Sequence, residues 1–290
     1  MGAWMKKYWS FILVMVFLVV SMVLPQLSDS DLTVDLGEFD FSFGGSDDDV
    51  IGRPGDDKFF TDAGGVSQEV DSEDDFVDIY TETIKPLMDN AVYGYNNSTV
   101  YGSLTLDVVI DTTSEIQASI GNGQYTTLSP GTQEVLLAIS GNRMFIRIVT
   151  DIGMNGMDMD YTEELYVENG TMYYRVIEFN SNYDQLFGSY NNTTMGRQLR
   201  AVMVGDLQGD WVKLEGSALE TMGTAGINSC RSFFTYLQNS GMSSSSEFTG
   251  GSSPKLEMTL SYAQTCTYRY SNIDNTTVKP VTDPIDLSNY

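Results

Sequence analysis

Methionines, glutamates and cysteines are the side chains of this sequence whose types and spacing could serve metal binding, acid–base catalysis or disulfide formation. Met154, Met157 and Met159 follow one another closely, with Met144 nearby. Thioethers bind Cu(I), but neither His nor a nearby Cys accompanies them. The spacing therefore favours flexible apolar packing against a core or a cavity. Met157 and Met159 would share one face, because alternate residues of a strand do.

Three glutamates form the second group. Glu163, Glu164 and Glu168 lie on or beside one predicted strand, and Glu164 and Glu168 are spaced to share a face. Paired carboxylates perform general acid–base chemistry in glycosidases. Nothing in the sequence marks a substrate or a raised pKa, and charged side chains on a strand are ordinarily solvated. We expect no catalytic residue and no enzyme, with carboxylate catalysis as the enzymatic alternative.

Cys230 and Cys266 are the only thiols. In an exported protein an even pair favours a disulfide. It would close a loop of 37 residues, counted inclusively, and contribute about 3–4 kcal/mol in the chain-entropy model. The alternative is two buried free thiols.

Composition excludes several functional classes. The chain has 290 residues, 40 acidic and 15 basic side chains, a formal net charge of −25 and no histidine. Imidazole-dependent triads and metal sites are excluded, and two Cys cannot form a four-Cys site. Nucleic acid is not an expected partner, because phosphates require clustered Lys and Arg. We expect neither a metal nor a cofactor. A hydrophobic content of 41% is enough for a folded core.

The N-terminus has the pattern of an export signal. Lys6 and Lys7 precede an apolar run, residues 11–24, that only Ser21 interrupts. This pattern predicts a signal anchor or signal peptide over residues 1–27. No obvious cleavage site follows, so an anchor is favoured and a cleaved signal is the alternative. The protein would reside at the cell membrane with an extracytoplasmic domain, or be secreted, and its N-terminal segment would contact the membrane.

An acidic segment separates this signal from the body of the chain. Residues 1–27 carry a charge of +2, residues 28–78 carry −15 and residues 79–290 carry −12. We interpret residues 28–72 as a disordered acidic linker. Its acidic run at residues 47–49 lacks the ligand pattern of a calcium-binding EF-hand.

The remaining part, residues 73–290, has the pattern of one α+β domain. Apolar spacing predicts a helix over 73–90, kinked or shortened by Pro86. Alternating residues and turn signals then predict a meander of strands, with a tight hairpin at Ser140–Asn142 and another at Asn169–Gly170. The expected strands are 100–110, 116–120, 133–139, 143–150, 157–167 and 172–179.

The second half of this domain mixes helices, loops and closing strands. Helical turns are expected within 181–209, a short strand at 211–214 and a helix over 227–238. The tract Ser243–Ser246 reads as a loop. Closing strands are expected at 256–262, 265–270 and 276–279. Because helices and strands do not alternate, the pattern indicates an α+β fold and not a parallel α/β fold.

These elements, in this order, resemble the LolA/LppX-like superfamily of bacterial envelope lipid carriers. The resemblance covers about residues 73–285 and is carried by segments 164–174, 210–214 and 272–280. It implies a curved, half-barrel-like antiparallel sheet with helices packed on its concave face and an apolar cavity for acyl chains. The chain departs from the lipoprotein members because it lacks their lipidated Cys, which leaves the mode of membrane attachment in doubt.

The function we expect is that of an exported, membrane-tethered domain that binds a lipid or another apolar ligand. The alternative is a structural or sensory surface module with a closed core and no small-molecule ligand. The candidate cavity residues are large and apolar: Met144, Met157, Met159, Phe187, Phe233 and Phe234.

Overall fold

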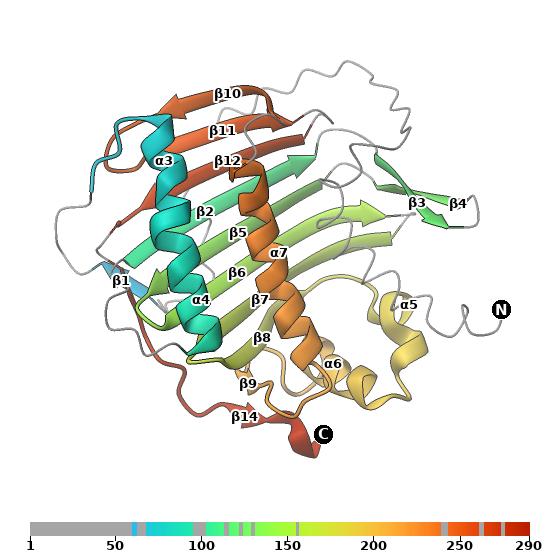
Figure 1. Cartoon of the computed structure of the whole chain (residues 1–290). Helices are drawn as coiled ribbons and strands as arrows, with labels where there is room; N and C mark the ends of the chain where they lie inside the picture. The colour runs from blue at the N-terminus through green and yellow to red at the C-terminus, as the bar shows by residue number, and fades with distance from the viewer. Residues whose placement is uncertain are drawn as a thin grey trace.

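The chain folds into an α+β domain built on a large, mainly antiparallel sheet that is not closed into a barrel (Figure 1). The computed structural model describes residues 60–62, 68–94, 103–112, 116–121, 124–128, 131–154, 157–238, 243–260, 264–273 and 276–290. The predicted signal 1–27 and most of the predicted linker lie outside these ranges. Within them, no helix has the length and apolarity to cross a membrane.

Twelve strands form the main sheet, in the order β10-β11-β12-β2-β5-β6-β7-β8-β9-β14, with β3 and β4 beside this path. All strand pairs in it are antiparallel except β9 with β14. The strands are β2 (Ser103–Thr112), β3 (Ile116–Gly121), β4 (Gln124–Leu128), β5 (Gly131–Ser140), β6 (Arg143–Met154), β7 (Met157–Glu168), β8 (Thr171–Phe179), β9 (Val212–Lys213), β10 (Ser243–Thr249), β11 (Lys255–Leu260), β12 (Gln264–Ser271) and β14 (Ile285–Asp286).

Both predicted hairpins are confirmed. Asn169 and Gly170 join β7 to β8 with φ angles of 50° and 79°. A two-residue turn with both φ values positive matches the right-handed twist of the flanking strands, and Asn-Gly is the sequence that adopts it most readily. Gly141, with φ of 62°, occupies the equivalent turn between β5 and β6.

The first helical segment continues past Pro86. It consists of α3 (Glu73–Ile79), a π-helical turn η2 (Tyr80–Ile84) and α4 (Lys85–Tyr93). Ser72 caps its start by accepting a hydrogen bond from the backbone N–H of Asp75 at 3.1 Å. Proline lacks an N–H and its ring clashes with the carbonyl four residues earlier. The wider η2 turn directly precedes Pro86, which lies in the first turn of α4.

The other helices are α5 (Tyr183–Phe187), the short η3 (Gly188–Tyr190), α6 (Thr194–Val204) and α7 (Glu220–Gln238), and η5 (Leu287–Asn289) follows β14. The expected helical turns within 181–209 are thus present. Helix α7 begins seven residues before the predicted start at Ile227. Its first turns contain Gly223 and Gly226, which lack side chains for an apolar periodicity.

Helices α3–α4 and α7 lie across one face of the sheet, which we call the helix-covered face (Figure 1). A Cβ on Gly223 would lie 2.6 Å from Leu214 and 3.7 Å from Leu165, so α7 packs closely against the strands. The Tyr268 hydroxyl on β12 donates to the carbonyl of Phe233 on α7 at 2.5 Å. The resulting core is aromatic and aliphatic, and its most deeply buried members include Phe76, Ile84, Leu87, Met88, Leu137, Phe234, Tyr268 and Tyr270.

The opposite face, called the outer face below, is covered in part by the segment after β12. Strand β13 (Thr276–Val278) contacts β2, β5 and β6. Val278 packs in a second apolar cluster with Leu136, Phe145 and Tyr166. β13 also pairs with β1 (Phe60–Asp62), which lies inside the predicted linker. Val70 is also buried, so ordered structure begins before Glu73.

The prediction of a loop at Ser243–Ser246 was wrong. These residues begin β10, which pairs with β11 at the end of the sheet. Ser245 and Ser246 are exposed at this edge. An exposed strand needs no apolar side chains, so its sequence lacks the apolar alternation that predicts a strand. Backbone pairing and the partly buried Phe248 hold the strand instead.

Candidate functional site

The predicted cavity residues are, where their side chains are described, tightly buried. Met144, Phe233 and Phe234 are at most 2% exposed and belong to the main apolar core, as does Phe187. Met159 is buried on β7. Met157 lies opposite Met154 in the β6–β7 register, and the side chains of both lie outside the described part. The core under α7 and α3–α4 is therefore filled by protein side chains.

The predicted disulfide is not formed. Cys230 on α7 and Cys266 on β12 are both free and buried. A disulfide requires close, specifically oriented Cα and Cβ atoms, and the two sulfur atoms are not bonded to each other. Burial raises the pKa of each thiol to about 12. Both cysteines thus behave as apolar core residues.

No group of three or more His, Cys, Asp or Glu side chains in the described residues is arranged to hold a metal ion. The copper alternative depends on Met154 and Met157, whose side chains lie outside the described part. The glutamates of β7 are the third group of candidate residues.

Glu163 and Glu164 are consecutive, so they lie on opposite faces of the sheet. Glu164 and Glu168 both lie on the outer face, as their spacing predicts. Glu163 lies on the helix-covered face, next to Leu165 along the strand. The two faces give these carboxylates very different surroundings.

On the outer face, Glu164 is enclosed by two arginines. Its carboxylate is fully buried and accepts hydrogen bonds from the Nε of Arg147 at 2.7 Å and the Nε of Arg175 at 2.5 Å. These three residues are direct cross-strand neighbours on β6, β7 and β8. The guanidinium of Arg175 also lies 4.6 Å from the centre of the Trp211 ring. Both carboxylate oxygens are bonded, so this group is a structural ion triad.

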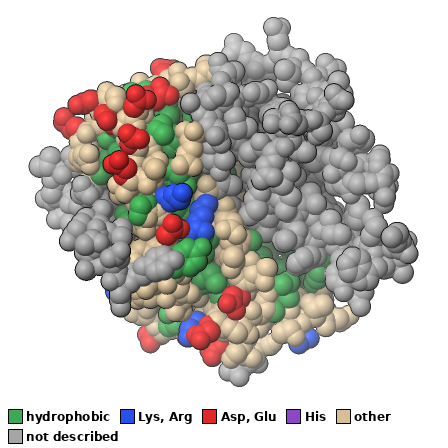
Figure 2. Space-filling model, in the orientation of Figure 1, with side chains coloured by type: hydrophobic (Ala, Val, Ile, Leu, Met, Phe, Trp, Pro, Cys, Tyr) green, Lys and Arg blue, Asp and Glu red, His purple; other side chains and the backbone are tan. Residues whose placement is uncertain are grey.

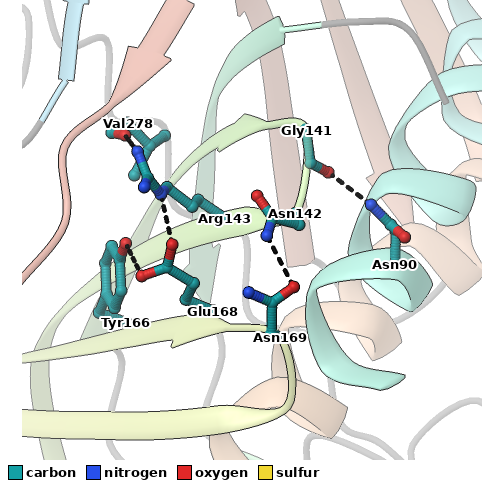
Figure 3. Close-up of polar contacts among 8 residues, drawn as sticks. All are labelled: Asn90, Gly141, Asn142, Arg143, Tyr166, Glu168, Asn169 and Val278. Carbon is teal, nitrogen blue, oxygen red and sulfur yellow. Dashed lines mark hydrogen bonds and ion pairs between the residues drawn. The ribbon is translucent and has the colours of Figure 1, made fainter. Parts of the chain in front are cut away.

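One row further along, the outer face is tied to two other parts of the fold (Figure 3). Arg143 donates to Glu168 at 2.7 Å and to the carbonyl of Val278 at 3.3 Å. At the adjacent hairpin ends, Asn142 donates to Asn169 at 2.7 Å, and Asn90 of α4 donates to the carbonyl of Gly141 at 3.0 Å. These bonds fix α4 and β13 to the two hairpins.

On the helix-covered face, Glu163 has no such cations. Its Oε2 accepts a hydrogen bond from the Tyr174 hydroxyl at 2.6 Å. Among the described residues it has no ion-pair partner, and its Oε1 has no hydrogen-bond partner. Glu163 nevertheless remains partly exposed. Among the described residues, therefore, only one of its two carboxylate oxygens is hydrogen-bonded.

Polar side chains continue from Glu163 toward the β6–β7 turn. Gln133, Thr150 and Tyr161 are cross-strand neighbours on β5, β6 and β7. Gln133 donates to the Thr150 hydroxyl at 3.3 Å, and Thr150 is hydrogen-bonded to Tyr161. We call these three residues, with Glu163 and Tyr174, the Glu163 cluster.

Aromatic rings border the Glu163 cluster on the β8 side. The ring of Tyr161 lies 6.2 Å from that of Phe179, which in turn lies 6.2 Å from Tyr183 and 6.4 Å from Phe187. Phe179, Tyr183 and Phe187 come from the end of β8 and from α5. The cluster is thus a polar patch between aromatic rings and the apolar core under α7.

Burial perturbs the ionisation of this cluster. Desolvation raises the pKa of Glu163, and the hydrogen bond from Tyr174 lowers it by a smaller amount. Desolvation and the Glu163 carboxylate raise the pKa of Tyr161 and of Tyr174. Both tyrosines are therefore neutral hydrogen-bonding groups at physiological pH. A perturbed carboxylate that is only partly enclosed is a feature of binding and catalytic sites.

The Glu163 cluster was missed by the sequence prediction. The sequence pattern predicts Tyr161 and Tyr174 only as strand residues, although the alternation of Tyr161 with Glu163 and Leu165 places Tyr161 on the same face as Glu163. Tyr174 is on another strand, opposite Leu165. Only the β7–β8 register shows that its hydroxyl reaches Glu163.

A second accumulation of charge lies on α3. Acidic side chains gather over this helix at the upper left of the space-filling view (Figure 2). They include Glu73, Asp74 and Asp75 in its first turn, where the positive end of the helix dipole favours them. The interaction of these acidic side chains with the N-terminal end of the helix therefore explains why they lie together.

No family model, curated protein or solved structure matches this chain.

Proposed function

We propose that this protein is an exported, membrane-tethered domain that binds a lipid or another amphipathic ligand through the Glu163 cluster. The proposal includes a curved, half-barrel-like sheet whose concave side is the helix-covered face. The supporting observation is the partly exposed Glu163 side chain, whose Oε1 has no hydrogen-bond partner among the described residues, between an apolar core and aromatic rings. Binding sites commonly combine apolar walls with a few polar groups that orient the ligand.

The position of the site follows from where α7 crosses the sheet. Leu165 is covered by Gly223 and Gly226 of α7, and Glu163 is the next residue of β7 on the same face. A ligand at Glu163 would therefore lie beside α7 and not beneath it. This differs from a cavity lined by Phe233 and Phe234, because these residues are packed inside the core.

The competing function is a structural or sensory surface module that binds no small molecule. The close packing under α3–α4 and α7 favours it, since a filled core leaves no apolar space between these helices and the sheet. The two functions differ in whether the face beside α7 holds a ligand.

Native mass spectrometry of the full chain, gently extracted from its membrane, tests the proposal. The expected result is a lipid-sized adduct that is lost in Tyr161→Trp, because the larger ring would occupy the partly exposed space beside Glu163. Tyr173→Trp, on the outer face, is the matched control and should retain the adduct. A mass without adduct after exposure to membrane lipids would favour the surface module instead.

A further inference from the structure

Glu163 is distinguished by the residues around it. On the helix-covered face of β5 to β8, between Gln133 and Phe179, the inward-facing side chains are neutral except for Glu163. Its cross-strand neighbours are Ile148 on β6 and Val176 on β8. A carboxylate with apolar neighbours is costly unless it is paired with a cation or fully hydrogen-bonded. Glu164 meets this requirement through two arginines, whereas Glu163 is bonded, within the described part of the chain, only to the Tyr174 hydroxyl.

From this juxtaposition we propose that the ligand of the Glu163 cluster carries an organic ammonium group, which binds the open Oε1 of Glu163 against the ring of Tyr161. This inference rests on the function proposed above and specifies the chemistry of its ligand. An ammonium N–H donates to carboxylate oxygens in short, strong, charge-assisted bonds. Aromatic faces also attract organic cations.

The distribution of charge argues against an anionic ligand head group. The arginines of β6 and β8 in contact with Glu164 and Glu168 lie on the outer face, across the sheet from Glu163. Arg200, near the aromatic rings, lies 5.1 Å from the Tyr183 ring centre and pairs with Asp184. A carboxylate or phosphate at Glu163 would meet a like charge and no described cation. The net charge of −25 also attracts cations to the protein as a whole.

Three probes with one tail and different head groups test this inference: hexylamine, hexan-1-ol and hexanoate. Isothermal titration at pH 7 would use the full chain in lipid nanodiscs, with empty nanodiscs as the blank. We expect hexylamine to bind about tenfold or more tightly than the other two. Glu163→Gln should abolish this preference, because the amide keeps the shape and hydrogen-bonding capacity but lacks the charge.

Glu178→Gln is the matched control, since it removes the same charge from an exposed residue of β8. It should leave the preference for hexylamine unchanged. Circular dichroism of both variants would confirm that they are folded. If Glu163→Gln does not fold, Tyr161→Leu replaces it, with a weaker but still measurable loss of hexylamine affinity expected.

The remaining outcomes separate this inference from the proposed function. Equal binding of all three probes, or tightest binding of hexanoate, would overturn the ammonium assignment and leave the amphipathic-ligand function standing. Failure of all three probes to bind would contradict both. A hexylamine preference that survives in Glu163→Gln would place the ammonium elsewhere and overturn the assignment to Glu163.

Discussion

Two adjacent carboxylates on opposite faces of β7 have different bonding partners. Glu164 is completely buried and held by Arg147 and Arg175, whereas Glu163 has one tyrosine hydroxyl and no described cation. Both side chains are desolvated by the same sheet. The comparison shows that burial alone does not assign a role to a charge. A carboxylate whose two oxygens are both bonded has no acceptor left, whereas one with an unbonded oxygen keeps the capacity to accept a further hydrogen bond.

The largest expected effect is on the outer face. Glu164→Gln should lower the free energy of unfolding by about 3–5 kcal/mol, because the buried guanidinium group of Arg147 and the largely buried one of Arg175 lose their counter-charge. Urea unfolding followed by circular dichroism measures this loss. A decrease below 1 kcal/mol would mean that Arg147 and Arg175 reach solvent when the carboxylate is removed, and the triad would then not be structural.

On the helix-covered face, Tyr174→Phe should cost about 1.5–3 kcal/mol, the range for a hydrogen bond to a charged group. The matched control is Tyr173→Phe on the outer face. The Tyr173 hydroxyl has no hydrogen-bond partner among the residues that the structure describes, so its removal should have almost no effect. Equal losses in the two variants would show that the Tyr174–Glu163 bond adds nothing specific.

A smaller effect is expected for Glu168→Gln. The Arg143–Glu168 pair is 34% and 24% exposed, and water screens such pairs. The free energy of unfolding should fall by about 0.2–1 kcal/mol. A loss as large as that of Glu164→Gln would remove the distinction between buried and partly exposed pairs on this face.

Glu163→Gln should have the smallest effect on stability, and of opposite sign. Because burial raises the pKa of Glu163 in the folded protein, folding takes up a proton between the unfolded and folded pKa values. The free energy of unfolding therefore falls as pH rises through that window. The variant should lack this decrease and be slightly more stable than the original protein at pH 8.

Thermal unfolding from pH 4 to pH 8 measures this difference. The two curves should meet near pH 4, where the carboxyl is protonated in both states, and separate as pH rises. Parallel curves would indicate that Glu163 is solvated in the folded protein. It would then differ from Glu164 only in its partners and not in its desolvation.

The parts of the fold that could be predicted are those determined by local chemistry. Asn169–Gly170 forces a tight turn, and the alternation of Met144, Ile146 and Ile148 predicts a strand with one buried face. Ser243–Ser246 was assigned to a loop because its strand depends on a partner, β11, and not on its own side chains. The early start of α7 was missed because Gly223 is required by the closeness of Leu214 and not by helix propensity.

The candidate site shows the same division. Alternation alone puts Glu163 and Glu164 on opposite faces, but it does not say which face the helices cover. The partners that distinguish the two glutamates lie on β6 and β8, and the β7–β8 register shifts between Thr162 and Glu163. The irregularity and the helix positions are tertiary features, so sequence periodicity could not identify Tyr174 as the partner of Glu163.

The strand order also has a consequence for how the chain is made. Strand β2 lies between β5, which follows it closely in sequence, and β12, which is synthesised about half a chain later. One edge of β2 therefore has no partner strand while the helices and strands between β5 and β12 are being synthesised. Exposed strand edges promote aggregation, and charged side chains on them oppose it. The late synthesis of β12 therefore leaves one edge of a nascent β2 open until the sheet is completed.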